Sequence, residues 1–251
     1  MYTDFASVYD RLMRDVPYQA WADFYLKLVK RHAPGARCVE CACGTGGLTI
    51  PLARAGLRMT GVDLSGPMLE LAMAKARDAG VAVPFVRQDM RALSLPSRAD
   101  AVLCTCDGVN YLTKRADVLA FFRAAHEALK PGGALIFDVS TPYKLGVELG
   151  TATRGLTDDD CAYLWNSVWQ ERTRLFGIRM DIFVREGGNY RRIVEEQTQR
   201  AHSREELSAW LAEAGFTAVR FYGDKKLRPP VERDLRWHIA AIKDQARSEK
   251  R

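Results

Sequence analysis

The stretch from Arg37 to Ile50, R-C-V-E-C-A-C-G-T-G-G-L-T-I, joins a short apolar run to a group of small residues and then to a segment that can begin a helix. The pattern predicts a strand, a glycine turn and a helix N-terminus, an arrangement that presents backbone N–H groups to a ligand. Gly44 and Gly46 stand where a side chain would hold ligand and backbone apart. Glycine also adopts the positive φ angles that such a turn often needs.

Strand-like and helix-like segments alternate outward from this turn. The expected strands after the first are residues 57–63, 83–86, 100–106, 134–139, 216–222 and 235–242, and the expected helices are 48–55, 65–79, 117–130 and 203–214. This alternation predicts an α/β fold, a doubly wound and mostly parallel seven-stranded sheet with helices on both faces. Ligands in such sheets bind at the carboxyl ends of the strands, where Gly44, Asp63, Asp89 and Asp107 would lie.

The pattern changes after Pro142, where three strand-like segments follow one another at residues 163–170, 174–185 and 189–199. We expect a small antiparallel insertion after the fifth strand. The predicted organisation is a helical lid of residues 1–36, a main domain of residues 37–142 and 200–245, and an insertion of residues 143–199. The insertion would serve as a substrate cap or as the contact of a homodimer. Its aromatic residues would roof a substrate or, as we prefer, pack the small sheet.

Composition limits the partners and the location. The chain has 251 residues, a net charge of +6 and a pI near 9.0. Its basic residues are spread along the chain with acids among them, so a small-molecule substrate is expected rather than a nucleic acid. No secretion signal and no apolar run of membrane-spanning length is evident. The expectation is a cytoplasmic protein without a membrane partner, with its six cysteines reduced.

Two nucleotide ligands compete for the glycine turn. If Ala42, Gly44 and Gly47 are the positions of a G-x-G-x-x-G pattern, the turn binds a dinucleotide and the protein is a nicotinamide-dependent oxidoreductase. If Glu40 and the positions Ala42, Gly44 and Gly46 carry the signal, the turn binds a nucleoside that bears an amino acid. The turn alone does not decide between them.

Five ordered segments decide it: V-E-C-A-C-G-T-G, G-V-D-L-S-G-P-M-L, R-Q-D-M, A-V-L-C-T-C-D-G-V-N-Y-L and L-K-P-G-G-A-L-I-F-D. This set resembles the motifs of class I (Rossmann-like) S-adenosylmethionine-dependent methyltransferases over residues 37–140, and more loosely over 203–242. The segment from Tyr9 to Met13, Y-D-R-L-M, looks like the branch with an N-terminal helical lid that acts on small molecules. The resemblance implies methyl transfer from S-adenosylmethionine to a nitrogen, oxygen or carbon atom. RNA methylation and a non-catalytic RNA-associated binding module stay open as alternatives.

The resemblance also implies roles for individual residues. Asp63 would accept hydrogen bonds from both ribose hydroxyls, Asp89 would take the adenine amino group, and Leu64 and Met90 would sandwich the ring. The methionine part would meet Glu40, Tyr9 and the backbone around Gly44 and Cys106. The implied cofactor-binding set is Tyr9, Glu40, Ala42, Gly44, Gly46, Asp63, Leu64, Met68, Asp89, Met90 and Cys106. Asp63 and Asp89 could instead be solvated acids or helix caps at strand ends.

Ala42 departs from the family pattern, because it stands where the first glycine is usual. Its methyl group should be tolerated if φ is negative, although it would crowd a closely approaching ligand.

The catalytic residue is harder to predict, because a sulfonium leaving group needs alignment more than a general base. The catalytic candidates are Asp107, Tyr111 and His202, and the substrate-binding candidates are Asn110, Tyr111, Tyr143 and His202. His202 could equally be a surface histidine before a helix cap. Asn110 and Tyr111 could be a loop cap and a core aromatic.

Two C-x-C pairs, Cys41 with Cys43 and Cys104 with Cys106, would lie at the ends of neighbouring strands. Four sulfur atoms in reach of one another could bind a metal or a thiophilic substrate. The spacing differs from that of common zinc sites, and residues two apart on a strand share one face. We therefore expect core packing and no metal site.

Overall fold

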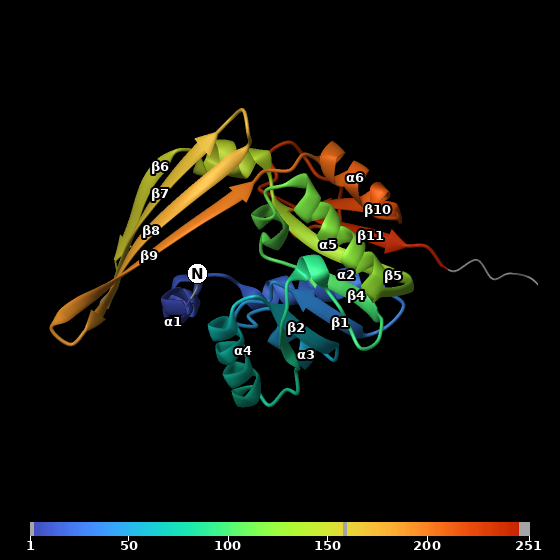
Figure 1. Ribbon diagram of the computed structural model, residues 1–251, viewed down its shortest axis with the longest axis horizontal. Coiled ribbons are helices and arrows are strands. Elements are labelled where there is room, and N and C mark those ends of the chain that lie inside the picture. Colours follow the sequence, from blue (N-terminus) through green and yellow to red (C-terminus); the bar gives the residue numbers. More distant parts are fainter. Residues whose placement is uncertain (1–2, 158–159, 246–251) are drawn as a thin grey trace, which may run out of the picture.

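The main sheet of the protein has seven strands, as a computed structural model describing residues 3–157 and 160–245 shows (Figure 1). The strands are β1 (Arg37–Cys41), β2 (Arg58–Asp63), β3 (Phe85–Arg87), β4 (Ala99–Cys104), β5 (Leu129–Ser140), β10 (Phe216–Gly223) and β11 (Arg236–Lys243). Their order is β10-β11-β5-β4-β1-β2-β3. The first five run parallel, and β11 is antiparallel to both β5 and β10. The predicted fold is confirmed.

Helices cover both faces of this sheet. One apolar cluster joins α2 (Tyr18–His32) and α3 (Thr49–Arg54) to one face, and a second joins α5 (Arg115–Ala128) and α6 (Arg204–Glu213) to the other. α4 (Gly66–Asp78) connects β2 to β3. The apolar residues of α5 recur at helical spacing, so Val118, Phe121, Phe122 and Ala125 are all fully buried. Central strand β4 is buried along its whole length, as expected for a strand covered on both sides.

Side-chain caps fix where two of these helices begin. The Ser65 hydroxyl accepts a hydrogen bond from the backbone N–H of Met68 at the start of α4. Ser203 and Glu206 form a capping box, in which each side chain accepts a hydrogen bond from the other residue's backbone N–H. These caps satisfy N–H groups that have no partner within the helix.

A second sheet of four antiparallel strands, here called sheet B, follows β5. Its strands are β6 (Ala152–Thr157), β7 (Cys161–Gln170), β8 (Leu175–Glu186) and β9 (Asn189–Arg200), in that order. The strand-rich insertion is confirmed, but β6 and the π-helix η3 (Tyr143–Leu149) were not predicted. Five of the six residues of β6 are exposed. Because neither face of this strand is buried, its sequence does not need the alternation of apolar and polar residues by which a strand is predicted.

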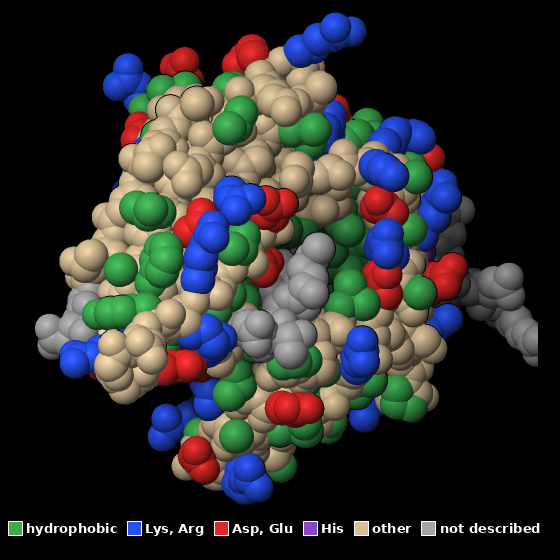
Figure 2. Space-filling model, turned by 60° about the vertical axis from the view of Figure 1, so that its left-hand side comes forward, with side chains coloured by type: hydrophobic (Ala, Val, Ile, Leu, Met, Phe, Trp, Pro, Cys, Tyr) green, Lys and Arg blue, Asp and Glu red, His purple; other side chains and the backbone are tan. Residues whose placement is uncertain are grey.

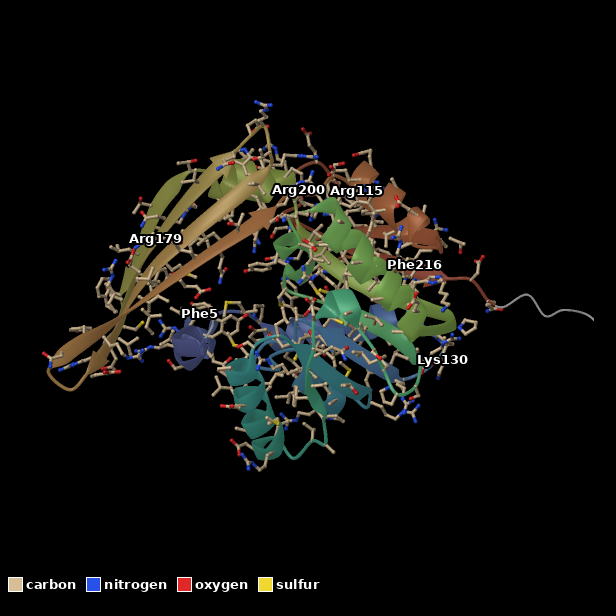
Figure 3. The ribbon with its side chains drawn as sticks, in the orientation of Figure 1. Phe5, Arg115, Lys130, Arg179, Arg200 and Phe216 are labelled. Atoms are coloured by element: carbon tan, nitrogen blue, oxygen red, sulfur yellow. The ribbon has the colours of Figure 1, made fainter. Side chains whose placement is uncertain are left out.

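The inner face of sheet B packs on helix α1 (Thr3–Leu12). Phe5 and Val8 of α1 share an apolar cluster with Phe176, Ile178 and other residues of sheet B. Figure 3 shows Phe5 on α1 beneath the strands of sheet B. The lid helix and sheet B thus stand together at one side of the main sheet (Figure 1). Within the described ranges, no helix combines the length and apolar character needed to cross a bilayer.

Candidate active site

A cavity of about 800 Å³ lies where the carboxyl ends of the parallel strands meet α1 and the inner face of sheet B. Figure 2 shows a hollow near the middle of the molecule with hydrophobic side chains along it. Of the residues expected at a cofactor, those that line the cavity are Tyr9, Glu40, Ala42, Gly44, Asp63, Leu64, Met68, Asp89, Met90 and Cys106. The lining also includes Phe5 on α1 and Arg236 on β11, so parts of the chain that are far apart in sequence meet at one cavity.

The glycine turn and Asp63 are joined by hydrogen bonds. The backbone N–H of Gly44 donates to Asp63 Oδ2 at 2.8 Å, and the N–H of Ser65 donates to Oδ1 at 2.9 Å. Each carboxylate oxygen thus takes one backbone donor and can accept a further one. Gly44 has φ +52°, and a Cβ built on it would have no atom within 4 Å. Its backbone is bare on the side of the cavity.

Gly46 does not line the cavity, contrary to the expectation that it sits against a ligand. A Cβ there would lie 3.2 Å from Ile50 and 3.3 Å from Ala72, so this glycine lets helices α3 and α4 approach the turn. Gly47 lines the cavity instead, and its missing side chain leaves room for the ring of Tyr18, which a Cβ would approach to 2.8 Å.

Ala42 does not have the negative φ at which its methyl group would be tolerated without strain. Its φ is +54°. The left-handed region costs a residue with a Cβ roughly 1–2 kcal/mol. The methyl group of Ala42 also lines the cavity. A glycine at this position would avoid this strain.

Glu40 is a buried carboxyl at the floor of the cavity. It is 1% exposed and accepts hydrogen bonds from the hydroxyls of Thr49 and Thr105, the latter at 2.5 Å. Burial raises the pKa of Glu40 to about 7, although the two hydroxyls act in the opposite direction. This group changes its charge near neutral pH.

The lid helix is held to the glycine turn by a network of polar side chains. Asp10 of α1 accepts hydrogen bonds from the hydroxyl of Thr45 at 2.6 Å and from the ammonium group of Lys75 at 2.7 Å. Thr45 belongs to the turn and Lys75 to α4. Asp10 thereby places its neighbour Tyr9 in the cavity, where burial raises the pKa of the Tyr9 phenol.

Asp107 belongs to a buried group of charges between β4, β5 and β11. Its carboxylate contacts the guanidinium of Arg236 and accepts a hydrogen bond from Ser140 Oγ at 2.7 Å. Lys144 Nζ lies 2.9 Å from Ser140 Oγ and 3.8 Å from Asp107. Burial alone would raise the pKa of Asp107, but Arg236 and Lys144 outweigh it and hold the pKa well below its usual range. A carboxylate held in this way is a weak general base.

The loop that follows β4 is held in place by Asp138, which is fully buried. Asp138 accepts hydrogen bonds from the backbone N–H groups of Cys106 and Asp107 and from the hydroxyl of Tyr25. The loop that carries Cys106 to the cavity is therefore rigidly supported from below.

Asp89 begins a short 3-10 turn, η1 (Met90–Ala92), where its side chain accepts from the backbone N–H of Arg91. The guanidinium of Arg91 also pairs with Asp89 and lowers the pKa of the carboxyl. Asp89 is thus a helix cap and also a cavity residue. Leu64 and Met90 also line the cavity, and Leu64 is 59% exposed.

Three substrate-binding candidates do not line the cavity. Asn110 is fully buried, donates to the carbonyls of Ser140 and Arg200, and accepts from the N–H of Ser140. His202 is also fully buried, so it is neither a surface residue nor a cavity residue. Its Nδ1 lies 2.8 Å from Arg200 and its Nε2 3.3 Å from the carbonyl of Val109, and burial lowers its pKa to about 4.

Tyr143 is the third, because the π-helix η3 directs its hydroxyl to Glu148 at 2.6 Å. Tyr111 does line the cavity, and its hydroxyl donates to Gln197 Oε1 at 2.8 Å.

Known proteins share this sequence and fold. Residues 38–133 match the family described as a methyltransferase domain. A protein of Geobacillus sp. (strain WCH70) named as a methyltransferase is 36% identical over 245 residues, which are 96% of this chain and 99% of that relative. The chain belongs to the methyltransferases. A crystal structure of an S-adenosylmethionine-dependent methyltransferase from Clostridium acetobutylicum ATCC 824 matches this methyltransferase with a TM-score of 0.86 and 30% identity, over 97% of this chain and 99% of that one.

The sugar N-methyltransferase KedS8 from Streptoalloteichus sp ATCC 53650 shares the fold, with a TM-score of 0.78 and 23% identity over 95% of this chain and 93% of that one. This chain is thus a class I methyltransferase enzyme with S-adenosylmethionine as its cofactor. These matches replace the two other interpretations of the sequence, a nicotinamide-dependent oxidoreductase and a non-catalytic binding module.

The two C-x-C pairs of this methyltransferase lie beside each other, since Cys41 and Cys104 are partners in the register of β1 and β4. Cys41, Cys43 and Cys104 are buried, and burial raises the pKa of each thiol. In the part of the chain that the structure describes, no three His, Cys, Asp or Glu residues are grouped so as to hold a metal.

Several cavity residues of the methyltransferase were not expected from the sequence. Thr45, Thr105, Lys144, Gln197 and Arg236 all line the cavity. A signal existed for Thr45 and Thr105, which lie inside the quoted motifs. Lys144, Gln197 and Arg236 reach the cavity from η3, β9 and β11, and no local pattern marks them.

Proposed function

We propose that this methyltransferase transfers the methyl group to a nitrogen, oxygen or carbon atom of a small molecule by in-line displacement beneath sheet B. One observation carries the proposal: a single cavity joins the carboxyl ends of β1, β2 and β4 to the inner face of sheet B. Such a cavity has room for cofactor and acceptor side by side. Of the two roles considered for residues 143–199, it supports the substrate cap.

The residues at the strand ends fit the cofactor. Asp63 offers one further acceptor position on each oxygen, which suits two ribose hydroxyls, and the bare backbone of Gly44 permits close approach. Leu64 and Met90 offer apolar surface for adenine, and Asp89 a carboxylate for its amino group. Glu40 and Tyr9 would meet the methionine part. When bound, the cofactor supplies an electrophilic methyl group on a positively charged sulfur.

The acceptor would occupy the end of the cavity beneath sheet B. Tyr111, Trp165, Phe176 and Gln197 line that end, so it combines aromatic surface with amide and phenol groups. Sheet B covers it as a roof, which favours a small molecule over a nucleic acid strand. Trp169 packs against Gly146 instead, since a Cβ on that glycine would lie 2.9 Å from its ring.

The chain's contribution to the rate is alignment and exclusion of water. Asn110, His202 and Asp138 fix the loop after β4 from within the core. Holding two reactants in line supplies a large part of the acceleration of a displacement reaction. We further propose that the enzyme works in the cytoplasm, in keeping with its six cysteines, none of which forms a disulfide within the described residues.

The test is incubation of the protein with isotope-labelled S-adenosylmethionine and separated fractions of small metabolites and RNA. The proposal expects the label in a small-molecule fraction. Label confined to RNA would contradict the small-molecule acceptor while leaving the methyltransferase assignment intact.

A further inference from the structure

Strand β9 of sheet B meets the cavity with its edge. Four consecutive residues of this strand, 196–199, line the cavity. Neighbouring side chains of a strand point to opposite faces of the sheet, and here Glu196 and Thr198 are exposed while Gln199 is buried. Residues from both faces line one cavity where the side of the strand is turned toward it. Figure 1 shows β9 as the strand of sheet B that borders the main domain.

This edge of β9 has no strand beside it. The order of sheet B is β6-β7-β8-β9, so β8 is the one ladder partner of β9 among the described strands. The backbone N–H and C=O groups on the other side of β9 therefore have no ladder partner. Such an edge binds extended peptides in proteins that recognise them by strand addition.

The register of β8 and β9 shows which backbone groups face outward. The N–H of Ala201 donates to the carbonyl of Arg174 at 2.9 Å, and these residues continue the register directly opposite each other. Hydrogen-bonded pairs alternate with non-hydrogen-bonded pairs along an antiparallel ladder. Every second residue counted from Ala201 therefore bonds to β8. Thr198 and Glu196 fall between them and turn their N–H and C=O groups away from β8.

Arg200 belongs to the same outward-facing set, because it lies two residues from Thr198. Its carbonyl accepts a hydrogen bond from the side-chain amide of Asn110 at 2.9 Å. Asn110 lies on the 3-10 turn η2 (Gly108–Tyr111) of the main domain. The outward side of β9 thus faces the main domain, and the backbone of Thr198 and Glu196 faces the cavity between the two.

We propose that the backbone of Glu196 and Thr198 binds an extended peptide unit of the methyl acceptor, which pairs with β9 as an added strand. This inference rests on the proposed function and narrows its substrate to short peptides and peptide-like small molecules. An acceptor residue opposite Thr198 donates its N–H to the Thr198 carbonyl and accepts from the Thr198 N–H. The acceptor therefore needs an amide group on each side of one carbon atom, a pattern that sugars and simple amines lack.

The experiment compares a mixture of tripeptides of varied sequence with the same mixture hydrolysed to free amino acids. The two probes carry the same side chains and differ in their amide bonds. Each is incubated with the full chain and isotope-labelled S-adenosylmethionine. The label should enter the intact tripeptides and not the hydrolysed mixture.

Proline at an outward-facing position tests the strand pairing itself. Thr198→Pro removes the N–H offered to the acceptor and no hydrogen bond to β8, and edge strands tolerate proline at such positions. It should raise the KM for the tripeptide mixture by roughly 3- to 10-fold, the effect of one hydrogen bond. Binding of S-adenosylhomocysteine, the demethylated product of the cofactor, should stay unchanged. Glu196→Pro is the second variant, and thermal melting shows whether each variant folds.

The matched control is Val194→Pro. Val194 is exposed, faces outward on the same edge of β9 and is not among the cavity-lining residues that the structure describes. This variant should keep the wild-type KM for the tripeptide mixture.

The failures are distinguishable. The inference is overturned if the tripeptides receive no label, if the hydrolysed mixture is labelled equally well, or if both folded cavity-side proline variants keep the wild-type KM. The proposed function still stands after each of these results if another small-molecule fraction is labelled. The proposed function itself fails if no small-molecule fraction is labelled although S-adenosylhomocysteine binds.

Discussion

Replacing Glu40 by glutamine should remove a specific pH dependence of stability. The pKa of this carboxyl is raised from 4.5 to about 7 by burial. Each pKa unit corresponds to 1.36 kcal/mol, so the ionised form costs about 3 kcal/mol in the folded protein. Glutamine has the same shape and no charge, and the hydroxyls of Thr49 and Thr105 can turn to suit its amide.

The sign follows from where the proton is bound. Between pH 4.5 and about 7 the folded protein keeps a proton on Glu40 that the unfolded chain has lost, so the wild-type free energy of unfolding falls as pH rises through this window. Above the window the cost is constant. The Glu40→Gln variant lacks this slope, so its stability relative to wild type should grow by about 3 kcal/mol between pH 4.5 and pH 8.

Urea unfolding of both proteins without cofactor, at half-unit steps from pH 4.5 to pH 8, measures this difference. Groups other than Glu40 titrate in both proteins and cancel in the comparison. Stability curves that run parallel across the window would refute the reasoning, because Glu40 would then ionise as it does in the unfolded chain.

Three further substitutions test the glycine turn, the lid and the loop after β4. Ala42→Gly should raise stability by roughly 0.5–1 kcal/mol, because it removes the strain of φ +54°; an unchanged or lower melting temperature would contradict this. Asp10→Asn should speed release of S-adenosylhomocysteine by up to roughly fivefold in stopped-flow measurements, since the Asp10–Lys75 pair is half-exposed and worth about 1 kcal/mol at most; release as slow as in the control Glu70→Gln on α4 would count against the network. Asn110→Ala should destabilise by about 2–3 kcal/mol in urea unfolding, because it strands buried backbone groups of Ser140; a loss below about 0.5 kcal/mol would refute the assignment.

The fold was predictable because its signals are local. Alternating strand and helix patterns and the capping box of Ser203 each act through residues close in sequence, and the alternation by itself favours a mostly parallel sheet covered by helices. β6 escaped prediction because it is an exposed edge strand with a glycine at its centre.

The site was predictable only where it lies at strand ends. Asp63 and Gly44 follow strands in the chain and reach the cavity directly. Asn110 and His202 have polar side chains typical of ligand sites, yet both are buried where the main domain meets β9, a contact that sequence spacing does not reveal. Gln197 shows the reverse, since only the placement of sheet B over the cavity brings this residue into the cavity lining.

Calorimetric titration with S-adenosylhomocysteine tests the central claim, that the cavity at the strand ends is the cofactor site. The wild-type protein should bind, and Asp63→Ala should bind more than about tenfold more weakly, since it loses hydrogen bonds to a charged acceptor worth roughly 1.5–3 kcal/mol. Asp78→Ala, which removes an exposed acid from the end of α4, should bind like wild type. Equal affinity of the Asp63 and Asp78 variants would contradict the claim and place the cofactor elsewhere.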